Sequence, residues 1–338
     1  MTRLWILRGL LVALGLAVLA GCVVPTPSPV APVSGQPGLQ VLAVTTFLAD
    51  IAQNVAGDRL TVASLIPIGL DPHAFEPTPQ DVARIAASQV LIVNGAGFEG
   101  WLERVLKNVD GERLVITASA GLAMREPGAS EIAHEHEHER DGHSGEATPE
   151  PAQEEEYAHH HREGDPHFWL DPVLVIKYVE NIRDGLSQAD PAGKAVYVAN
   201  AAAYIAELNE LHQWILAQVA TIPPERRLLV TNHESFGYFA DRYGFTIVGT
   251  VIPSVSTGAS PSAQEMAALI ERIKETGAPA IFLETGGNPR LARQIAQEAG
   301  VKVVTELFTH SITDASGPAP TYIEMMRYNV RTIVDALQ

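Results

Sequence analysis

Short apolar runs alternate with longer amphipathic segments from residue 39 onward, and this alternation restricts the fold more than any other feature of the sequence. The apolar runs have the length and composition of strands that are buried on both faces of a sheet. Strands separated by helices favour a parallel sheet with right-handed crossovers, so we predict an α/β fold. The predicted strands are 39–47, 61–68, 90–97, 113–119, 227–233, 245–252, 278–284 and 301–307. The predicted helices are 47–56, 78–88, 101–108, 172–186, 191–219, 262–276, 288–299 and 321–337.

The long helical stretch between these two sets of strands predicts two α/β lobes, each with a mostly parallel sheet and with a cleft between them. The expected limits are 39–171 for the first lobe, 172–189 for a linker helix and 190–338 for the second lobe. Asp190 is placed to cap the second part of the helical stretch, and Pro191 suits its first turn. A single doubly wound domain is the alternative.

The first 21 residues predict a signal peptide, because Arg3 and Arg8 stand at the start of an apolar run, 9–20, that is too short to span a bilayer. This run ends in Leu-Ala-Gly-Cys, which resembles the bacterial lipobox and implies cleavage before Cys22 and lipidation of its thiol. A simple signal peptide with an incidental cysteine is the alternative. Residues 22–38 hold five prolines and predict a tether. We therefore expect a lipid-anchored protein at the extracytoplasmic face of a cell membrane, on the periplasmic or extracellular side.

The sequence carries 40 acidic and 23 basic residues, a formal net charge of -17, which argues against nucleic acid as a partner and attracts cations. Residues 131–165 hold 12 Asp or Glu against two Arg, a net charge of -10. This segment predicts a mobile loop that collects transition-metal ions loosely, with a merely solvated acidic insertion as the alternative. Its seven histidines are His134, His136, His138, His143, His159, His160 and His161.

Four further histidines share a position at the ends of predicted strands or at the start of the segment that follows the acidic loop. They are His73, His167, His233 and His310. Ligands of open α/β sheets bind outside the carboxyl ends of the strands, so we expect these four side chains to line the cleft, two from each lobe. His212 lies in the middle of a predicted helix among apolar residues, and we interpret it as structural.

Two of these histidines follow the dipeptide Asp-Pro, at 71–73 and 165–167. Proline keeps the preceding backbone out of the helical region, so each Asp-Pro predicts a fixed turn. A fixed turn aims the imidazole that follows it, which a metal site requires.

The chain resembles the solute-binding lipoproteins of zinc and manganese ABC importers, the ZnuA/TroA/PsaA family. The resemblance covers residues 39–338 and rests on DPHAFEPTPQD, DPHFWLDP, TNHESFGYFADRYGF, FLETGGNPRLARQIAQEAGV and GPAPTYIEMMRYN. It implies two α/β lobes joined by a long helix, with the metal between them. It also implies that the partner is an ABC permease with its ATPase, and we expect the chain to act as a monomer.

Carried over by position, the family's first three ligands fall on His73, His167 and His233. The fourth ligand of the family is usually an aspartate, whereas this chain has His310 in the matching stretch, with Asp314 as the reserve. In having histidine at position 233, the chain resembles the zinc-type members of the family, whereas the manganese-type members tend to have glutamate there. Imidazole nitrogen suits zinc, copper and nickel, whereas manganese prefers oxygen. We therefore expect Zn²⁺, with Mn²⁺, iron or nickel as alternatives if Asp314 completes the set, and an affinity that falls below about pH 6.5 because the ligands must be unprotonated.

Three glutamates stand near these ligands, and we expect Glu284 in particular to accept a hydrogen bond from the far nitrogen of a ligand histidine. Glu76 and Glu234 are weaker candidates for that role, and Phe168 and Trp169 are expected in the core or the cleft wall. A surface zinc hydrolase with Glu234 as the base is the alternative function. The His-Glu-x-x-His helix signature is absent, so we expect a transport protein rather than an enzyme.

Overall fold

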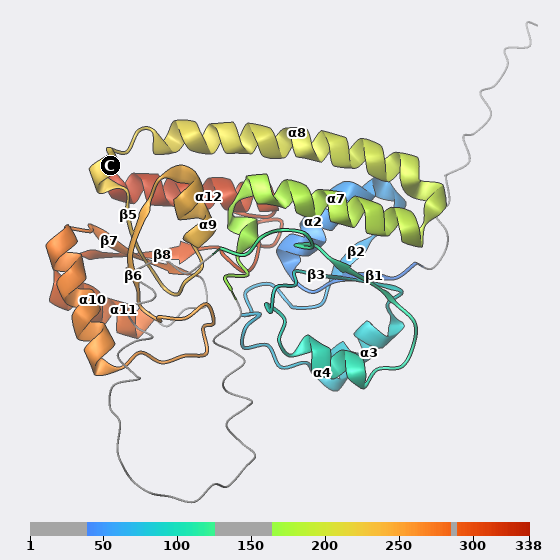
Figure 1. Cartoon of the computed structure of the whole chain (residues 1–338), viewed down its shortest axis with the longest axis horizontal. Coiled ribbons are helices and arrows are strands. Elements are labelled where there is room, and N and C mark those ends of the chain that lie inside the picture. Colours follow the sequence, from blue (N-terminus) through green and yellow to red (C-terminus); the bar gives the residue numbers. More distant parts are fainter. Residues whose placement is uncertain (1–38, 126–163, 285–288) are drawn as a thin grey trace, which may run out of the picture. The chain divides into compact units, whose positions relative to one another are not determined.

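The computed structural model describes residues 39–125, 164–284 and 289–338, which form an α/β fold built on parallel strands (Figure 1). The signal peptide, Cys22, the tether and the seven histidines of the acidic loop lie outside the described residues. Within the described ranges, no helix is long and apolar enough to cross a membrane.

The first half of the described chain holds a four-stranded parallel sheet with the strand order β2-β1-β3-β4. Its strands are β1 (Val41–Ala43), β2 (Val62–Ser64), β3 (Val90–Val93) and β4 (Leu114–Thr117). The elements between them are α2 (Thr46–Ala56), η1 (Gly57–Arg59), α3 (Pro79–Ala87) and α4 (Leu102–Lys107). All four residues of β3 are buried, as expected of a strand covered on both faces.

The second half contains two pairs of parallel strands, and the first strand of one pair lies next to the first strand of the other. The pairs are β5 (Leu228–Thr231) with β6 (Thr246–Thr250), and β7 (Ala280–Glu284) with β8 (Lys302–Leu307). The helical elements are η5 (Pro224–Arg226), α9 (Gly237–Tyr243), α10 (Ala263–Thr276), α11 (Pro289–Ala299) and α12 (Tyr322–Leu337).

Two long helices, α7 (Pro172–Ala189) and α8 (Lys194–Val219), come between these sets of strands in the sequence and lie side by side in the structure (Figure 1). The turn η3 (Phe168–Leu170) precedes α7, and η4 (Pro191–Gly193) joins it to α8. Helix α7 packs against α2 and β4, whereas α8 packs against α2 and also against α9 and α12. Helix α8 therefore contacts elements of both halves, and the lobe limits drawn from the sequence stay a prediction.

The predicted cap at Asp190 is wrong. The side chain of Asp190 caps neither η4 nor α8; its Oδ1 accepts a hydrogen bond from Arg59 Nη2 at 2.9 Å, and its Oδ2 accepts one from the Tyr197 hydroxyl at 2.6 Å. The arginine brings a full charge and two donors to the carboxylate, one to each oxygen, which a cap bond to a single main-chain N–H does not. Helix α3 does begin with a side-chain cap, because the Thr78 hydroxyl accepts the N–H of Asp81 and the Asp81 carboxylate accepts the N–H of Thr78.

The core passes from the first sheet through η3 to the second half of the chain. Trp169 is completely buried, with its ring stacked on Phe47 at 4.6 Å between ring centroids and meeting Phe98 edge-on at 4.8 Å. Phe168 is 1 % exposed and packs against Tyr238. Both aromatic residues after His167 thus belong to the core, and they fix the turn that carries that histidine.

Candidate metal centre

Four histidines from distant parts of the sequence meet at the carboxyl-terminal edge of the strands. His73 lies in the loop after β2, His167 directly precedes η3, His233 follows β5, and His310 follows β8. Each can offer one ligand atom to the same point, because these atoms all lie within 4.8 Å of one another. The structure therefore brings together the four residues that the sequence singled out.

The Nε2 atoms face one another at the distances that a small tetrahedral ion requires. His167 Nε2 lies 3.3 Å from His73 Nε2, 3.2 Å from His233 Nε2 and 3.5 Å from His310 Nε2. A tetrahedron with metal–nitrogen bonds of about 2.0–2.1 Å has nitrogen–nitrogen edges of about 3.3–3.4 Å. The six distances between ring centroids run from 4.9 to 5.6 Å, so no ring stands apart from the others.

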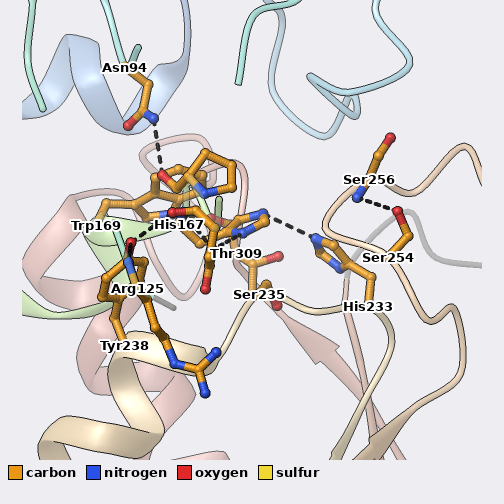
Figure 2. A network of polar contacts seen from close by, with 12 residues as sticks. Asn94, Arg125, His167, Trp169, His233, Ser235, Tyr238, Ser254, Ser256 and Thr309 are labelled. Carbon is orange, nitrogen blue, oxygen red and sulfur yellow. Dashed lines mark hydrogen bonds and ion pairs between the residues drawn. The ribbon is translucent and has the colours of Figure 1, made fainter. Parts of the chain in front are cut away.

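Carboxylates behind two of the rings set which nitrogen faces the centre. His167 Nδ1 lies 2.7 Å from Asp165 Oδ1, and His233 Nδ1 lies 2.7 Å from Glu284 Oε1. A carboxylate accepts hydrogen bonds, so each Nδ1 carries the hydrogen and each ring turns its Nε2 toward the centre; Figure 2 shows this for His167 and His233, whose Nε2 atoms lie 3.2 Å apart. In their neutral form these nitrogen atoms are free to bind a cation at the centre.

The second carboxylate oxygen of Glu284 lies near another of the four histidines, His310. Its Oε2 accepts a hydrogen bond from the Thr309 hydroxyl and lies 3.5 Å from His310 Nδ1. The carboxyl group is buried at the end of β7, so one side chain orients rings that belong to β5 and β8. The expected partnership of Glu284 with a ligand histidine is thus present in the structure, with His233 as that histidine.

Both Asp-Pro-His segments form the same turn. The main-chain N–H of His73 donates to Asp71 Oδ1 at 2.9 Å, and that of His167 donates to Asp165 Oδ1, also at 2.9 Å. Aspartate favours this local bond to the backbone two residues on, and proline in the middle removes a competing donor. The repeat therefore holds each histidine backbone in place through its own aspartate.

The segment that carries His310 is tied to the first half of the chain. Trp169 Nε1 donates to the Thr309 carbonyl at 2.6 Å, and the Ser311 hydroxyl receives bonds from Thr46 Oγ1 at 3.2 Å and from the Gly69 N–H at 3.0 Å (Figure 2 draws Trp169 and Thr309). The residues on both sides of His310 are thus fixed by side chains from α2 and η3 and by the main chain of the loop after β2. This anchoring aims the fourth ring at the other three.

Burial keeps most of these imidazoles neutral. It lowers the pKa of His73 to about 4, with the charge of His233 adding to the effect, and it lowers the pKa values of His167 and His310 well below their usual range. Burial opposes the charged form of His233 too, but the charge and hydrogen bond of Glu284 raise its pKa. A neutral imidazole is the form that binds a metal ion.

The remaining candidates lie outside this cluster. Asp314 is exposed and its carboxylate accepts bonds from Ser316, so within the described residues His310 and not Asp314 joins the other three histidines. Glu76 is exposed, and Glu234 is half-buried outside the cluster. His212 lies on α8, where its Nδ1 is 3.1 Å from the Tyr243 hydroxyl.

Several site residues were missed by the sequence reasoning. Asp71 and Asp165 were read as turn formers, although Asp165 also orients the ring of His167. Thr309 was not considered, nor was Thr257, whose hydroxyl donates to Asp71 Oδ2 across 186 residues of sequence. The aspartates carried a local signal, since they stand two residues before a histidine, whereas Thr257 and Thr309 carried none.

The sequence matches a known protein family over most of its length. The family described as "ZnuA: Zinc-uptake complex component A periplasmic" matches residues 41–336. The chain is similar to the manganese-binding lipoprotein MntA of Halalkalibacterium halodurans, with 34% identity over 89% of each chain. It is also similar to the manganese ABC transporter substrate-binding lipoprotein PsaA of Streptococcus pneumoniae, with 28% identity over 90% of each chain.

Solved structures of the same kind share the fold. The periplasmic zinc-binding protein TroA of Treponema pallidum matches with a TM-score of 0.73 and 26% identity, over 89% of this chain and 99% of that one. A manganese-bound periplasmic metal-binding protein of Candidatus Liberibacter asiaticus matches with a TM-score of 0.71 and 25% identity, over 88% and 99%. The α/β fold predicted from the sequence is confirmed, and so is the expectation of a transport protein rather than an enzyme. The family match covers nearly the whole described chain, and the chain therefore belongs to the ZnuA family of substrate-binding proteins of metal ABC transporters.

Proposed function

We propose that this protein binds Zn²⁺ through His73, His167, His233 and His310 and delivers it to an ABC permease and its ATPase for import. The observation that carries the proposal is the convergence of four imidazole Nε2 atoms at the edge lengths of a zinc tetrahedron. Four protein ligands close such a site, whereas a catalytic zinc site keeps one position for water. A closed site suits a protein that carries an ion and hands it on.

The donor set favours zinc over manganese. All four ligand atoms are nitrogen, and manganese prefers carboxylate, carbonyl and water oxygen. The carboxylates of Asp165 and Glu284 lie behind the rings, where they compensate the charge of the ion without contacting it.

Manganese is the second candidate, because relatives such as MntA and PsaA are named for manganese. Competition separates the two ions: chelator-treated protein is titrated with a mixture of Zn²⁺ and Mn²⁺, and the bound metal is measured after gel filtration. We expect zinc to displace manganese from the four-histidine site. Retention of manganese against equimolar zinc would overturn the assignment.

The ligand assignment is tested by single substitutions. His73→Ala and His233→Ala are each expected to weaken zinc binding by more than about 100-fold, because removing even a partner behind a ligand costs about 10–100-fold. His212→Ala is the matched control, since that histidine lies on α8 and bonds to Tyr243 instead. Equilibrium competition with a chromophoric chelator measures all three. Unchanged affinity in both ligand variants would exclude this site.

Cys22 is proposed as the lipid attachment point, supported by its lipobox-like context and by relatives that are named lipoproteins. Cys22→Ser is expected to release the protein from membranes in fractionated cells.

The acidic loop is proposed to collect metal ions for the site. Deleting 131–163 and measuring zinc uptake at scarce zinc tests that role.

A further inference from the structure

A cavity of about 250 Å³ lies beside the four histidines. Its lining includes His310, Glu284, Asp71, Thr257 and Asn232, so it reaches one of the four rings and the carboxylate that orients two of them. The side chain of His310 is 9 % exposed, whereas His167 and His233 are completely buried, so the cavity meets the site at a ring that solvent can reach.

Asn232 is a buried polar residue in the lining of this cavity. It is 3 % exposed, and its main-chain carbonyl accepts the N–H of Ile252 at 2.8 Å. Its side chain lines the cavity, and among the described residues it makes no hydrogen bond to the protein. The amide is not one of the fully enclosed polar groups of the described residues that lack a partner, so the cavity is where it meets water or a ligand.

The polar side of the cavity suits a cation. Asp71 and Glu284 bring negative charge, and no lysine or arginine is among the described residues of the lining. The amide of Asn232, the hydroxyl of Thr257 and the carboxylate of Asp71 offer oxygen atoms. Oxygen is the donor that a hydrated divalent cation accepts, either directly or through its waters.

The size of the cavity fits the ion with its water shell. A water molecule takes about 30 Å³ in the liquid, so six waters around a cation need about 180 Å³. The cavity of about 250 Å³ accommodates this volume, whereas the space between the four Nε2 atoms, 3.2–3.5 Å apart along the measured edges, admits only a bare ion.

We propose that this cavity is a second cation site, in which a hydrated divalent cation is held by Asn232, Asp71 and Thr257 before it exchanges water for imidazole at His310. The inference rests on the proposed function, because it needs a metal ion as the cargo of the four histidines. Asn232 contacts the ion on its way in and on its way out, so its loss slows both steps.

Stopped-flow mixing of metal-free protein with Co²⁺ tests this, because cobalt in a tetrahedral nitrogen site has a visible absorption that cobalt held loosely elsewhere lacks. Asn232→Leu keeps the side-chain volume and removes the amide. We expect it to slow association, and dissociation into excess chelator, by about tenfold or more, the loss expected for a hydrogen bond to a charged group. Asn209→Leu is the matched control, since that exposed amide bonds to its own helix α8. It should leave both rates unchanged.

Calcium provides an independent test of the second site, because it prefers oxygen ligands and does not suit four imidazoles. We expect millimolar Ca²⁺ to slow Co²⁺ entry into the wild-type protein beyond NaCl of equal ionic strength, and to have no such effect in Asn232→Leu. Should Asn232→Leu fail to fold, Thr257→Val takes its place.

Association of Asn232→Leu at the wild-type rate would overturn the second site. Faster dissociation with unchanged association would also overturn it, because Asn232 would then position the neighbouring His233. Failure of the proposed function has a different signature: the wild-type protein itself would develop no tetrahedral cobalt spectrum.

Discussion

At the scale of single residues, the same Asp-Pro-His turn positions His73 and His167 in different ways. Each aspartate holds the main-chain N–H of its histidine. Asp165 also bonds to the ring of His167, whereas the second oxygen of Asp71 bonds to Thr257 in the loop after β6. The second turn therefore fixes a ring by itself, and the first turn depends on a segment from the other half of the chain.

Asp165→Asn tests the contribution of the carboxylate behind His167. The amide can still accept the main-chain N–H of His167, but it loses the charge that favours an Nδ1–H ring and a cation at Nε2. We expect zinc affinity to fall by about 10–100-fold. Chelator competition at pH 7 measures it, with Asp314→Asn as the control because that carboxylate is exposed and accepts hydrogen bonds from nearby Ser316. Equal losses in both variants would point to net charge rather than position as the cause.

At the scale of helices and strands, the junction between α7 and α8 is held by an ion pair. Arg59 beside Asp190 lowers the pKa of that carboxyl to about 2, with the Tyr197 hydroxyl adding to the effect. The pair links η1 of the first half to η4 between the two long helices. It thereby fixes the turn from which α8 runs along α2 and α12.

This ion pair predicts a pH dependence of folding. A carboxyl whose pKa is lowered by folding stabilises the native state above its usual pKa of about 3.9, and the stabilisation is lost as pH falls from about 4 to about 2. We expect Asp190→Asn to cost about 1 kcal/mol at pH 7, because the amide can still accept a hydrogen bond from Arg59 but carries no charge, and to flatten stability between pH 4 and 2. Urea unfolding at several pH values measures this. Asp184→Asn, on the exposed side of α7, should change little.

The sequence predicted strands better than it predicted their ends. Each of the eight apolar runs contains an observed strand, because strands of a parallel sheet are covered on both faces and are therefore short, continuous and rich in β-branched apolar residues. The run 39–47 was too long, since α2 already begins at Thr46. Helix α9 was missed because its seven residues include five buried ones and show no polar face.

The four histidines of the candidate site were predictable for a reason that does not extend to their hydrogen-bond partners. Three of them, His73, His233 and His310, follow strands, and the carboxyl ends of parallel strands share one edge, whereas His167 follows the second Asp-Pro turn. Glu284 and Thr257 reach their partners across 51 and 186 residues of sequence, so only the folded chain brings those atoms together. Asn232 shows no sign in the sequence that its amide faces a cavity.

At the scale of the whole described chain, the site joins segments from both halves. His73 and His167 come from the part before α7, and His233 and His310 come from the part after α8. Further bonds cross between these parts, from Thr46 to Ser311 and from Tyr322 to the Trp169 carbonyl at 2.6 Å. An ion held by all four rings would add a link between the two parts of the chain.

Metal removal should therefore lower the stability of the whole fold. A ligand that binds only the native state stabilises it by about 4 kcal/mol at 1,000 times its dissociation constant. We expect the thermal midpoint to rise on adding Zn²⁺ to chelator-treated protein and to fall again with excess chelator, as measured by calorimetry. His310→Ala should lose most of this shift, whereas His212→Ala should keep it. A midpoint that is independent of zinc in the wild type would contradict a shared site.

The packing of Trp169 gives the protein an optical signal of its own. Its ring centroid lies 5.1 Å from that of His167 and 6.0 Å from that of His310, and its indole N–H is bonded to the residue before His310. A charge arriving between those imidazoles changes the field at the indole, so the emission of this tryptophan reports occupancy without any attached dye. Trp101 and Trp214 stand in other surroundings, next to Phe75 and under Arg327 respectively, and provide a constant background.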